Sequence, residues 1–255
     1  MSLLFDATRT AYLHDYDGVH YRFADHPDPA GFFADCAIET LREVFSGVSD
    51  DDIAQIYRTS IQDHGIGHVG FFEMAHQRGI CIDEFTGFFS REFHSTVYET
   101  MKSDFPLWAA KNSNAVRCFQ LLNGSVKHGL LTMGDVEVWA EKVLGHKGII
   151  DFFDPNCLLG FEECKRYMKS KSDYPVGLAM EKLEVEPRQT VFIEDSIPNL
   201  EMAKMAYPEI FTVLVGARHI HGELDCVDMQ VPNLLSFLQE AVAVHAPQEG
   251  QKFIL

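Results

Sequence analysis

The sequence predicts an α/β fold, in which a doubly wound parallel sheet forms a Rossmann-like core and a helical cap domain is inserted into it. Three observations predict this fold. From Pro106 onward, short apolar runs alternate with helical patterns, as in parallel sheets covered by helices. A further apolar run, Ala11–His14, lies far upstream, and only helical patterns separate it from the others. We therefore expect residues 1–19 and 104–255 to form the core and residues 20–103 to form the cap.

The first predicted strand ends in two carboxylates, Asp15 and Asp17, which are followed at once by Gly18. Side chains alternate between faces along a strand, so the chain must leave the sheet near Asp17 if both carboxylates are to share a site. Gly18 permits that departure because it tolerates backbone angles that other residues avoid. In an α/β sheet ligands bind at this edge, although a polar turn closing the strand would give the same local pattern.

Four helical patterns come next, with short connections and no convincing strand, and they predict a compact helical unit. Asp28 and Pro29 are typical of a helix start, as the N-cap and the first helical residue. We expect this helix to end at Gly47. The other three are expected to begin at Ser49 and end at Gly65, to cover residues 71–78, and to begin with Asp83 as the cap. Their phenylalanines recur at helical spacing and are expected to pack against one another rather than to line a ligand site.

The second half of the chain supplies the rest of the expected core. Helices are expected at 108–122, 136–144 and 176–183, from Asn199 onward, and at 233–244. Strands are expected at 128–132, 149–153, 190–194 and 210–215, with an irregular stretch after residue 153. Because this arrangement places the helical unit directly after the two acids, we expect that unit to cover the site like a lid.

Composition narrows the class of protein. With 46% hydrophobic and 23% charged residues, the chain is typical of a globular protein. Its net charge of −17 argues against a nucleic-acid polymer or an anionic membrane as a partner, because those partners call for clustered Lys and Arg. A small phosphorylated metabolite stays compatible with this charge, since a metal ion can supply positive charge locally.

Cysteine usage and the apolar pattern bear on location. The 6 cysteines are scattered, with no Cys-x-x-Cys pair, which favours reduced thiols over disulfides or a zinc site. The first residues lack the pattern of a signal peptide, and there is no run of about eighteen apolar residues. We expect a cytoplasmic protein that is a monomer or a homodimer.

Two other strand ends carry residues suited to phosphate and metal chemistry. Thr132, Met133 and Gly134 would place a hydroxyl and backbone N–H groups where they can hold phosphate oxygens, although a threonine is also common in strands. Glu194 and Asp195 follow a very apolar run, so a cation, best magnesium, is expected to offset their charge. The alternative for this pair is a solvated acidic loop.

A basic patch precedes the helix expected at 176–183. It contains Lys169 and Lys171, and one lysine of this patch is expected to reach the phosphate while the others remain solvated.

These motifs, in this order, resemble the four motifs of the haloacid dehalogenase-like hydrolase superfamily: Asp-x-Asp-Gly-Val, a strand ending in Thr, a lysine before a helix, and Glu-Asp-Ser-x-x-Asn. The resemblance covers residues 11–19 and 106–215, and the inserted helices match the position and size of that superfamily's helical cap. The cap segments 57–71 and 82–85, and the long run from Asp154 to the lysine, are similar to the pyrimidine 5′-nucleotidase branch. The third motif departs from the usual Lys-Pro, since Ser172 follows Lys171; Lys171 is preferred over Lys169.

The resemblance implies a magnesium-dependent phosphatase that acts on a small phosphate monoester through an aspartyl-phosphate intermediate. Asp15 is then the nucleophile, and Asp17 protonates the leaving alcohol and later deprotonates water. Magnesium is held by Asp15, the Asp17 carbonyl, Asp195 and Glu194. The phosphate is held by Thr132 and Lys171 and by the backbone of Met133 and Gly134.

Several functions remain open on these motifs. The substrate implied by the branch is a nucleoside monophosphate, with phosphoglycolate and sugar phosphates as alternatives. A phosphomutase would share the same motifs. A haloacid dehalogenase needs no second acid, so Asp17 argues against it, and a non-enzymatic binding protein would be expected to have lost some of the acids. The bend at 65–70, with His64 and His68, is the expected lining for the leaving group.

Overall fold

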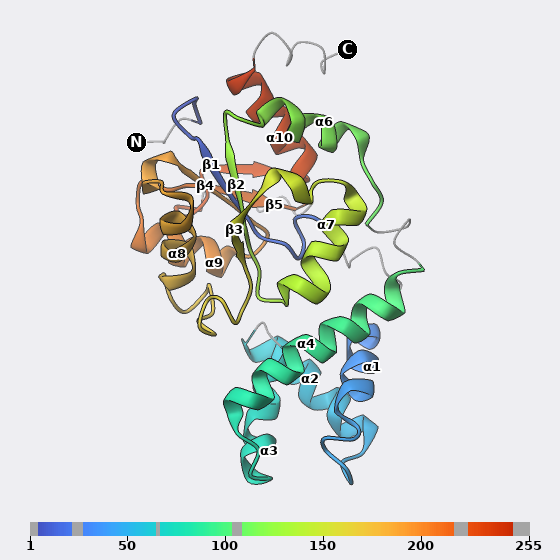
Figure 1. The fold of residues 1–255 in the computed structure, drawn as a ribbon. Coiled ribbons are helices and arrows are strands. Elements are labelled where there is room, and N and C mark those ends of the chain that lie inside the picture. The colour runs from blue at the N-terminus through green and yellow to red at the C-terminus, as the bar shows by residue number, and fades with distance from the viewer. Residues whose placement is uncertain (1–4, 22–27, 65–66, 104–108, 217–223, 247–255) are drawn as a thin grey trace.

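The computed structural model describes residues 5–21, 28–64, 67–103, 109–216 and 224–246, and in this part of the chain it confirms a parallel sheet of six strands (Figure 1). The strands lie in the order β3-β2-β1-β4-β5-β6, and each neighbouring pair is parallel. Their bounds are β1 Ala11–His14, β2 Lys127–Leu131, β3 Phe153–Leu159, β4 Thr190–Glu194, β5 Phe211–Val215 and β6 Met229–Val231. Although β1 comes first in the chain, it lies in the interior of the sheet, between β2 and β4.

Helices cover both faces of the sheet, which makes it doubly wound as expected. On one face lie α6 (Ser113–Leu122), α7 (Glu141–Lys147) and α10 (Leu234–His245), and on the other lie α8 (Tyr174–Leu183) and α9 (Ile197–Ala206). Each face has its own cluster of buried apolar side chains. Tyr12 belongs to one cluster and Leu13 to the other, as the alternation along a strand requires. The end of β1 is therefore held between two packed layers.

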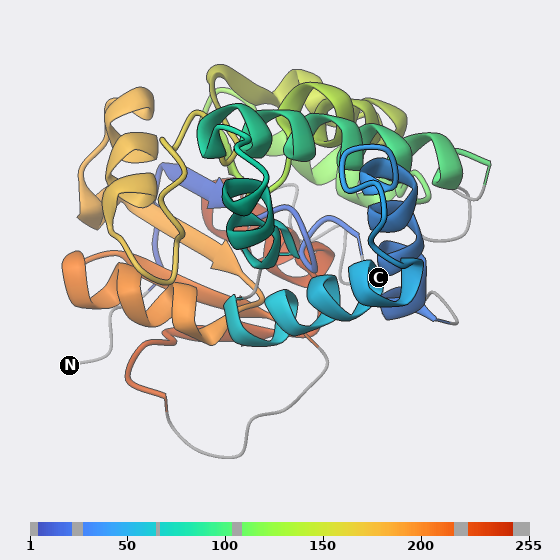
Figure 2. The same ribbon diagram turned by 90° about the horizontal axis from the view of Figure 1, so that it is seen from below.

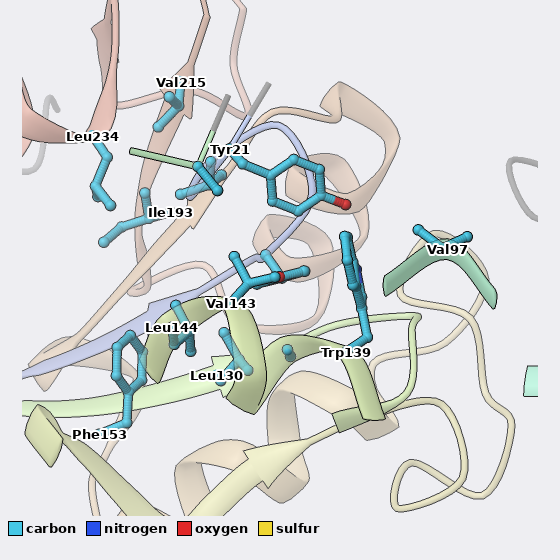
Figure 3. Packing of buried hydrophobic residues seen from close by; sticks show 14 of the residues in the cluster. Tyr21, Val97, Leu130, Trp139, Val143, Leu144, Phe153, Ile193, Val215 and Leu234 are labelled. Carbon is cyan, nitrogen blue, oxygen red and sulfur yellow. The ribbon is translucent and has the colours of Figure 1, made fainter. Parts of the chain in front are cut away.

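The larger cluster also receives a one-turn π-helix, η3 (Val136–Ala140), that precedes α7. Figure 3 shows its Trp139, with Val143 and Leu144 of α7, beside Leu130 and Phe153 of the sheet. These large side chains are fully or almost fully buried, so the loop that follows β2 is packed firmly against the sheet.

Residues 28–101 form a helical unit beside the sheet (Figures 1 and 2). It contains α1 (Pro29–Leu41), α2 (Asp50–His64), the 3₁₀ turn η2 (Gly67–Phe71), α3 (Phe72–Gln77) and α4 (Ile82–Met101). Its phenylalanines pack against one another: the rings of Phe89 and Phe93 stack with centroids 5.1 Å apart, and both are buried. None of the described helices is both long enough and apolar enough to span a bilayer.

Several helix boundaries differ from the expected ones. The first helix is capped by Asp28 as predicted, but it ends at Leu41 and continues as turns to Gly47. Asp83 is not a cap; Cys81 precedes the helix, and Asp83 lies in its first turn, where a carboxylate favours the helix dipole. The helix expected from residue 108 begins at Ser113, capped by Asn112, and residue 108 itself lies outside the described residues. Gly65, the expected end of the second helix, lies outside them as well.

The strand expected at 149–153 is wrong. Residues 150–152 form a 3₁₀ turn, and the strand β3 begins only at Phe153. Its exposed Pro155 and Asn156 gave it the appearance of an irregular stretch; a proline is tolerated because β3 is an edge strand. The other edge strand, β6, is only three residues long and was not predicted.

Candidate active site

The carboxyl ends of β1 and β4 bring three carboxylates together. Asp15 directly follows β1, and its backbone N–H donates to the carbonyl of Ile193 at 2.8 Å, which continues the pairing of the two strands. Glu194 is the last residue of β4, and Asp195 follows it. One oxygen from each carboxylate lies within 4.8 Å of the other two. Acids that the sequence places 179 residues apart (194 minus 15) thus share one edge of the sheet.

Asp17 lies over the same edge because the chain turns sharply after β1. Gly18 has a φ of +76°, and a Cβ at this position would collide with the carboxylate of Asp195, so both the turn and the close approach require glycine. The hydroxyl of Tyr21 donates to the Asp17 carboxylate, and the Thr132 hydroxyl also forms a hydrogen bond with it. Two hydroxyl groups therefore fix the orientation of Asp17.

Lys169 is the cation at the centre of the site. Its Nζ donates to the carboxylate of Asp15, to Glu194 Oε2 at 2.8 Å and to the carbonyl of Leu131 at 3.2 Å. The side chain is only 2% exposed. A buried ammonium group with three acceptors is held in one position, between the ends of β1, β2 and β4.

This placement favours Lys169 over Lys171, the lysine that the sequence preferred, as the one that contacts Asp15. The backbone N–H groups of Lys171 and Ser172 both donate to the carbonyl of Met168 at 3.0 Å, so the chain coils at this point. Residues two apart on such a turn point in different directions, and while Lys169 reaches inward, Lys171 is exposed. Lys171 lines the same cavity but does not take the contact with Asp15.

Negative charge exceeds positive charge in the site. Burial, and then the charge of Glu194, raise the pKa of Asp15 well above its usual value, and Lys169 offsets only part of this effect. Burial also raises the pKa of Asp17 to about 6 and that of Asp195 to about 7. Burial alone would lower the pKa of Lys169, but the two carboxylates that it contacts raise it, so it stays charged. One ammonium group thus faces four carboxyl groups.

This surplus of carboxylate oxygen fits a divalent cation such as magnesium. Asp15, Glu194 and Asp195 form a cluster of side chains close enough together to hold a metal ion. Within the described residues no other such cluster is found. Glu194 already accepts hydrogen bonds on both oxygens, from the backbone N–H groups of Asp195 and Ser196 and from Lys169. Asp15 and Asp195 are therefore the better direct ligands, and Glu194 orients its neighbours. The contribution of the Asp17 carbonyl stays a prediction.

The loop after β2 lies beside the same site. Thr132 is fully buried, and its hydroxyl accepts a hydrogen bond from the backbone N–H of Gly134 at 3.0 Å. The sequence predicted that the Gly134 N–H donates to phosphate, but in this structure it already donates to the Thr132 hydroxyl. Met133, between them, lines the cavity in front of the site. The role of these three residues in binding phosphate stays a prediction.

A cavity of about 460 Å³ opens in front of these groups, and the helical unit forms its other side. The last four residues of α2, from Ile61 to His64, line it together with Asp15, Asp17 and Lys169. Of the expected lining, His64 faces this cavity, whereas residues 67, 69 and 70 of the bend, which are described, do not line it. The side chain of His68 lies outside the described residues.

Sequence reasoning missed Gln62, Asp63 and Tyr21. The first two gave no signal, since they are exposed residues on a helix, and only the packing of α2 over the sheet brings them to the cavity. Tyr21 lies four residues after Asp17, on the far side of a glycine turn, where its hydroxyl returns to the carboxylate. The glycine predicts a turn, but the sequence does not show on which side of Asp17 the turn places Tyr21.

Comparison with protein families gives one match. A model of the haloacid dehalogenase-like hydrolases matches residues 10–206. The chain is similar to a β-phosphoglucomutase from Clostridium difficile, with a TM-score of 0.59 and 17% identity over 96% of this chain and 98% of that one. It is also similar to a putative β-phosphoglucomutase from Thermotoga maritima, with a TM-score of 0.54 and 19% identity over 91% and 99%.

An L-2-haloacid dehalogenase from Xanthobacter autotrophicus is similar as well, with a TM-score of 0.50 and 15% identity over 91% of this chain and 98% of that one. At these identities the likeness concerns the fold. No curated protein sequence matches the chain.

Proposed function

Because the chain belongs to the haloacid dehalogenase-like hydrolase family, we propose that it is a magnesium-dependent phosphatase that hydrolyses a small phosphate monoester. The observation that carries the proposal is the buried carboxylate of Asp15 at the end of β1, in contact with Lys169 and two residues before Asp17. A carboxylate held beside a fixed cation is suited to attack phosphorus and form an acyl phosphate.

In the first step an Asp15 oxygen attacks phosphorus, and the bond from phosphorus to the leaving alcohol breaks. Lys169 favours the ionised form of Asp15, which attack requires. Asp17 gives its proton to the alcohol oxygen as that bond breaks. Its pKa of about 6 leaves a fraction of it protonated near neutral pH, whereas an ordinary aspartate would be almost fully ionised.

In the second step Asp17, now ionised, takes a proton from water, and the oxygen of that water attacks phosphorus. The bond between phosphorus and Asp15 breaks, and the enzyme returns with Asp17 protonated. The hydroxyl groups of Tyr21 and Thr132 keep the Asp17 carboxylate in place through both steps. A group fixed in this way is already oriented when the reaction begins.

Asp15 and Asp195, oriented by Glu194, would hold magnesium, which when bound would neutralise phosphate charge during attack by an anion. The sequence favoured Lys171 for the phosphate contact. We assign this contact to Lys169 instead, because Lys169 is the lysine that faces the proposed nucleophile. Thr132, directly after β2, is proposed as a second phosphate contact.

We also propose that residues 20–103 act as a cap and choose the substrate. The end of α2 lines the cavity above Asp15, which supports a small leaving group held between cap and core. A nucleoside monophosphate, with a pyrimidine preferred, is the first candidate; sugar phosphates and phosphoglycolate follow. A panel of these esters and a phosphopeptide, ranked by kcat/KM, tests this order. Efficient turnover of the phosphopeptide would contradict an enclosing cap.

The central test is whether phosphate becomes attached to Asp15. Wild-type protein, incubated with a labelled monoester and magnesium and then quenched in acid, is expected to carry label at Asp15 in peptide mapping. Asp15→Asn is expected to carry none, to lose more than about 10³-fold in turnover, and to keep its fold, because the replacement is nearly isosteric. Activity that survives full removal of magnesium would refute the metal requirement.

A phosphomutase is the second candidate, since two similar structures are described as β-phosphoglucomutases. A mutase would return the phosphoryl group from Asp15 to a second hydroxyl of the same sugar, instead of to water. The two functions are separated by following hexose phosphates and measuring isomerised product against free phosphate.

A further inference from the structure

Helix α2 meets the cavity above Asp15 with its C-terminal end. The last four residues of the helix, 61–64, all line that cavity, and four consecutive residues point in all directions around a helix. The cavity therefore faces the end of α2 rather than one of its sides. A helix of 15 residues carries a partial negative charge at this end, because the carbonyl groups of its last turn lack the N–H groups of a following turn.

Asp63 adds a full negative charge at the same place. It lines the cavity and is exposed, and no lysine or arginine forms an ion pair with it in the described part of the chain. The other three residues of this turn are Ile61, Gln62 and His64. None of the described cap residues that line the cavity is a lysine or an arginine, so the cap offers no such cation to the leaving group.

The core side of the cavity does not outweigh this charge. Within the described ranges two lysines line the cavity, against five acidic residues: Asp15, Asp17, Asp63, Glu194 and Asp195. A divalent cation would offset two negative charges, and the phosphate group of a substrate would add about as many again. A second anionic group on the substrate would thus find no surplus of positive charge, and toward the cap it would meet Asp63.

We propose that Asp63 and the C-terminal end of α2 select the substrate by charge, so that the leaving alcohol is neutral or carries an ammonium group. An alcohol that bears a carboxylate or a second phosphate is rejected. Hydroxyl and ammonium groups can donate to the Asp63 carboxylate and to carbonyls at the end of α2, whereas an anionic group is repelled by both. This inference rests on the proposed phosphatase and names a class of ester within it: nucleosides and neutral sugars are accepted, and glycolate is not.

Three esters of nearly equal size separate charge from shape. Hydroxyethyl phosphate is neutral beyond its phosphate, phosphoethanolamine carries an ammonium group, and phosphoglycolate carries a carboxylate. For the wild type with magnesium, kcat/KM is expected to be at least about tenfold lower for phosphoglycolate than for hydroxyethyl phosphate, as a like charge about 8 Å away predicts at an effective dielectric constant of about 20. Phosphoethanolamine is expected to equal or exceed hydroxyethyl phosphate. Equal values for phosphoglycolate and hydroxyethyl phosphate would contradict the proposal.

Asp63→Asn removes the charge and keeps the size of the side chain. It is expected to reduce the preference for hydroxyethyl phosphate over phosphoglycolate at least about fivefold, and Asp63→Lys is expected to reverse it, because the charge at the end of α2 then changes sign. Asp51→Asn is the matched control. It removes the same charge from the first turn of the same helix, where Asp51 is exposed and outside the cavity, and is expected to keep the wild-type preference.

Binding of two phosphonates tests the charge selection without turnover, because their carbon–phosphorus bond is not a phosphate ester. 3-Phosphonopropionate carries a carboxylate, and 3-hydroxypropylphosphonate carries a hydroxyl group in its place. Calorimetry with magnesium is expected to show tighter binding of the hydroxyl compound by the wild type, and a preference at least about fivefold smaller in Asp63→Asn.

The two readouts distinguish failure of this inference from failure of the proposed function. Hydrolysis of none of the esters, together with the expected change in phosphonate binding, would refute the phosphatase and support the charge selection. Hydrolysis with the same preference in the wild type and in Asp63→Asn would overturn the charge selection and leave the phosphatase standing. An unchanged ratio of the two phosphonate dissociation constants in Asp63→Asn would overturn it as well.

Discussion

The carboxylates of Asp15 and Glu194 lie on two sides of one buried ammonium group, that of Lys169. Neither carboxylate is exposed, so removal of the lysine would leave two acids facing each other without a cation. Lys171, two residues later, is exposed and has no such neighbours among its described contacts. Although the two lysines lie in the same short basic stretch, their substitution is therefore expected to have different effects on activity and stability.

We expect Lys169→Met to lower kcat/KM by on the order of 10²–10⁴-fold, because the group that faces the nucleophile and the phosphate is lost. Without magnesium it is also expected to destabilise the fold by about 3–5 kcal/mol, the usual effect of breaking a buried ion pair. Lys171→Met is the matched control and is expected to change kcat/KM by less than about threefold, since it removes an exposed charge. Steady-state kinetics and urea unfolding measure both variants. A larger loss in Lys171→Met would reverse the assignment.

Acid sensitivity is expected to reside in a group of buried histidines. His128 Nδ1 lies 3.0 Å from His14 Nε2, both rings are buried, and burial lowers the pKa of His128 to about 3. In the unfolded chain a histidine titrates near 6.5, so the unfolded state takes up the proton first. The stability that His128 contributes is therefore complete above about pH 6.5 and is lost as the pH falls toward 3.

The variant that tests this is His128→Gln, which removes one group that takes up a proton when the protein unfolds in acid. Between about pH 6 and pH 4, the free energy of unfolding of the variant is expected to fall less steeply than that of the wild type, by up to about 1.4 kcal/mol per pH unit. His76→Gln, on an exposed helix surface, is the control and is expected to keep the wild-type slope. Urea titrations at several pH values give the slopes. Equal slopes in all three proteins would show that His128 is not a source of acid sensitivity.

At the scale of elements, the interior of the sheet was predictable from the sequence and its edges were not. β1, β4 and β5 are buried along their whole length, so each appears as a continuous apolar run. β3 and β6 lie at the two edges, where exposed residues such as Pro155 and Gln230 interrupt the pattern. These segments are strands because each pairs with a neighbouring strand, and such pairing cannot be predicted from the local sequence pattern.

The candidate site divides in the same way. Asp15, Glu194 and Asp195 follow apolar runs directly, so strand ends alone bring them together, and the turn at Gly18 adds Asp17. Lys169 comes from a loop whose path depends on Lys165 and Arg166, both with positive φ, which local sequence rules do not anticipate in residues other than glycine. The preference for Lys171 did not take this path of the loop into account. The position of Gln62 in the cavity depends on how the whole of α2 packs over the sheet, which the local sequence does not predict.

The cap of α1 gives a test of local sequence rules at the level of one helix. Asp28 accepts a hydrogen bond from the backbone N–H of Gly31 at 2.9 Å, as its position before Pro29 predicted. Asp28→Ala is expected to lower the free energy of unfolding by about 1 kcal/mol, because that N–H loses its acceptor. Asp35→Ala, on the exposed side of the same helix, is expected to change it by less than about 0.5 kcal/mol. Chemical unfolding of both variants decides the point; equal effects would show that the cap does not contribute.

At the scale of the whole molecule, two arginines make polar contacts between the helical unit and the core within the described ranges. Arg166 of the core donates to the carboxylate and carbonyl of Asp83 at the start of α4, and Arg91 of α4 lies 3.4 Å from Glu137. Exposed ion pairs of this kind stabilise by only about 0–1 kcal/mol each. The end of α2, by contrast, lines the catalytic cavity, so substrate bound there would add contacts between cap and core that the free protein lacks.

This arrangement separates the two chemical steps. In the proposed mechanism all substrates give the same phosphorylated Asp15, and the leaving group departs before water attacks, so contacts between α2 and the leaving group would act on the first step alone. Gln62→Ala and His64→Ala are therefore expected to change kcat/KM by about tenfold or more, and to different extents for different esters, as the loss of individual hydrogen bonds predicts. The rate at which phosphorylated enzyme releases phosphate is expected to stay within about twofold of wild type.

Rapid-quench measurements of labelled enzyme separate the two rates for each ester. Gln55→Ala is the matched control, because Gln55 is exposed on the same helix and bonds to Thr59, outside the cavity. It is expected to leave both steps unchanged. If the two cavity variants slowed release of phosphate as much as they slowed its attachment, α2 would be acting on Asp15 or Asp17 rather than on the leaving group. If they altered every ester equally, the cap would shape the cavity without choosing among substrates.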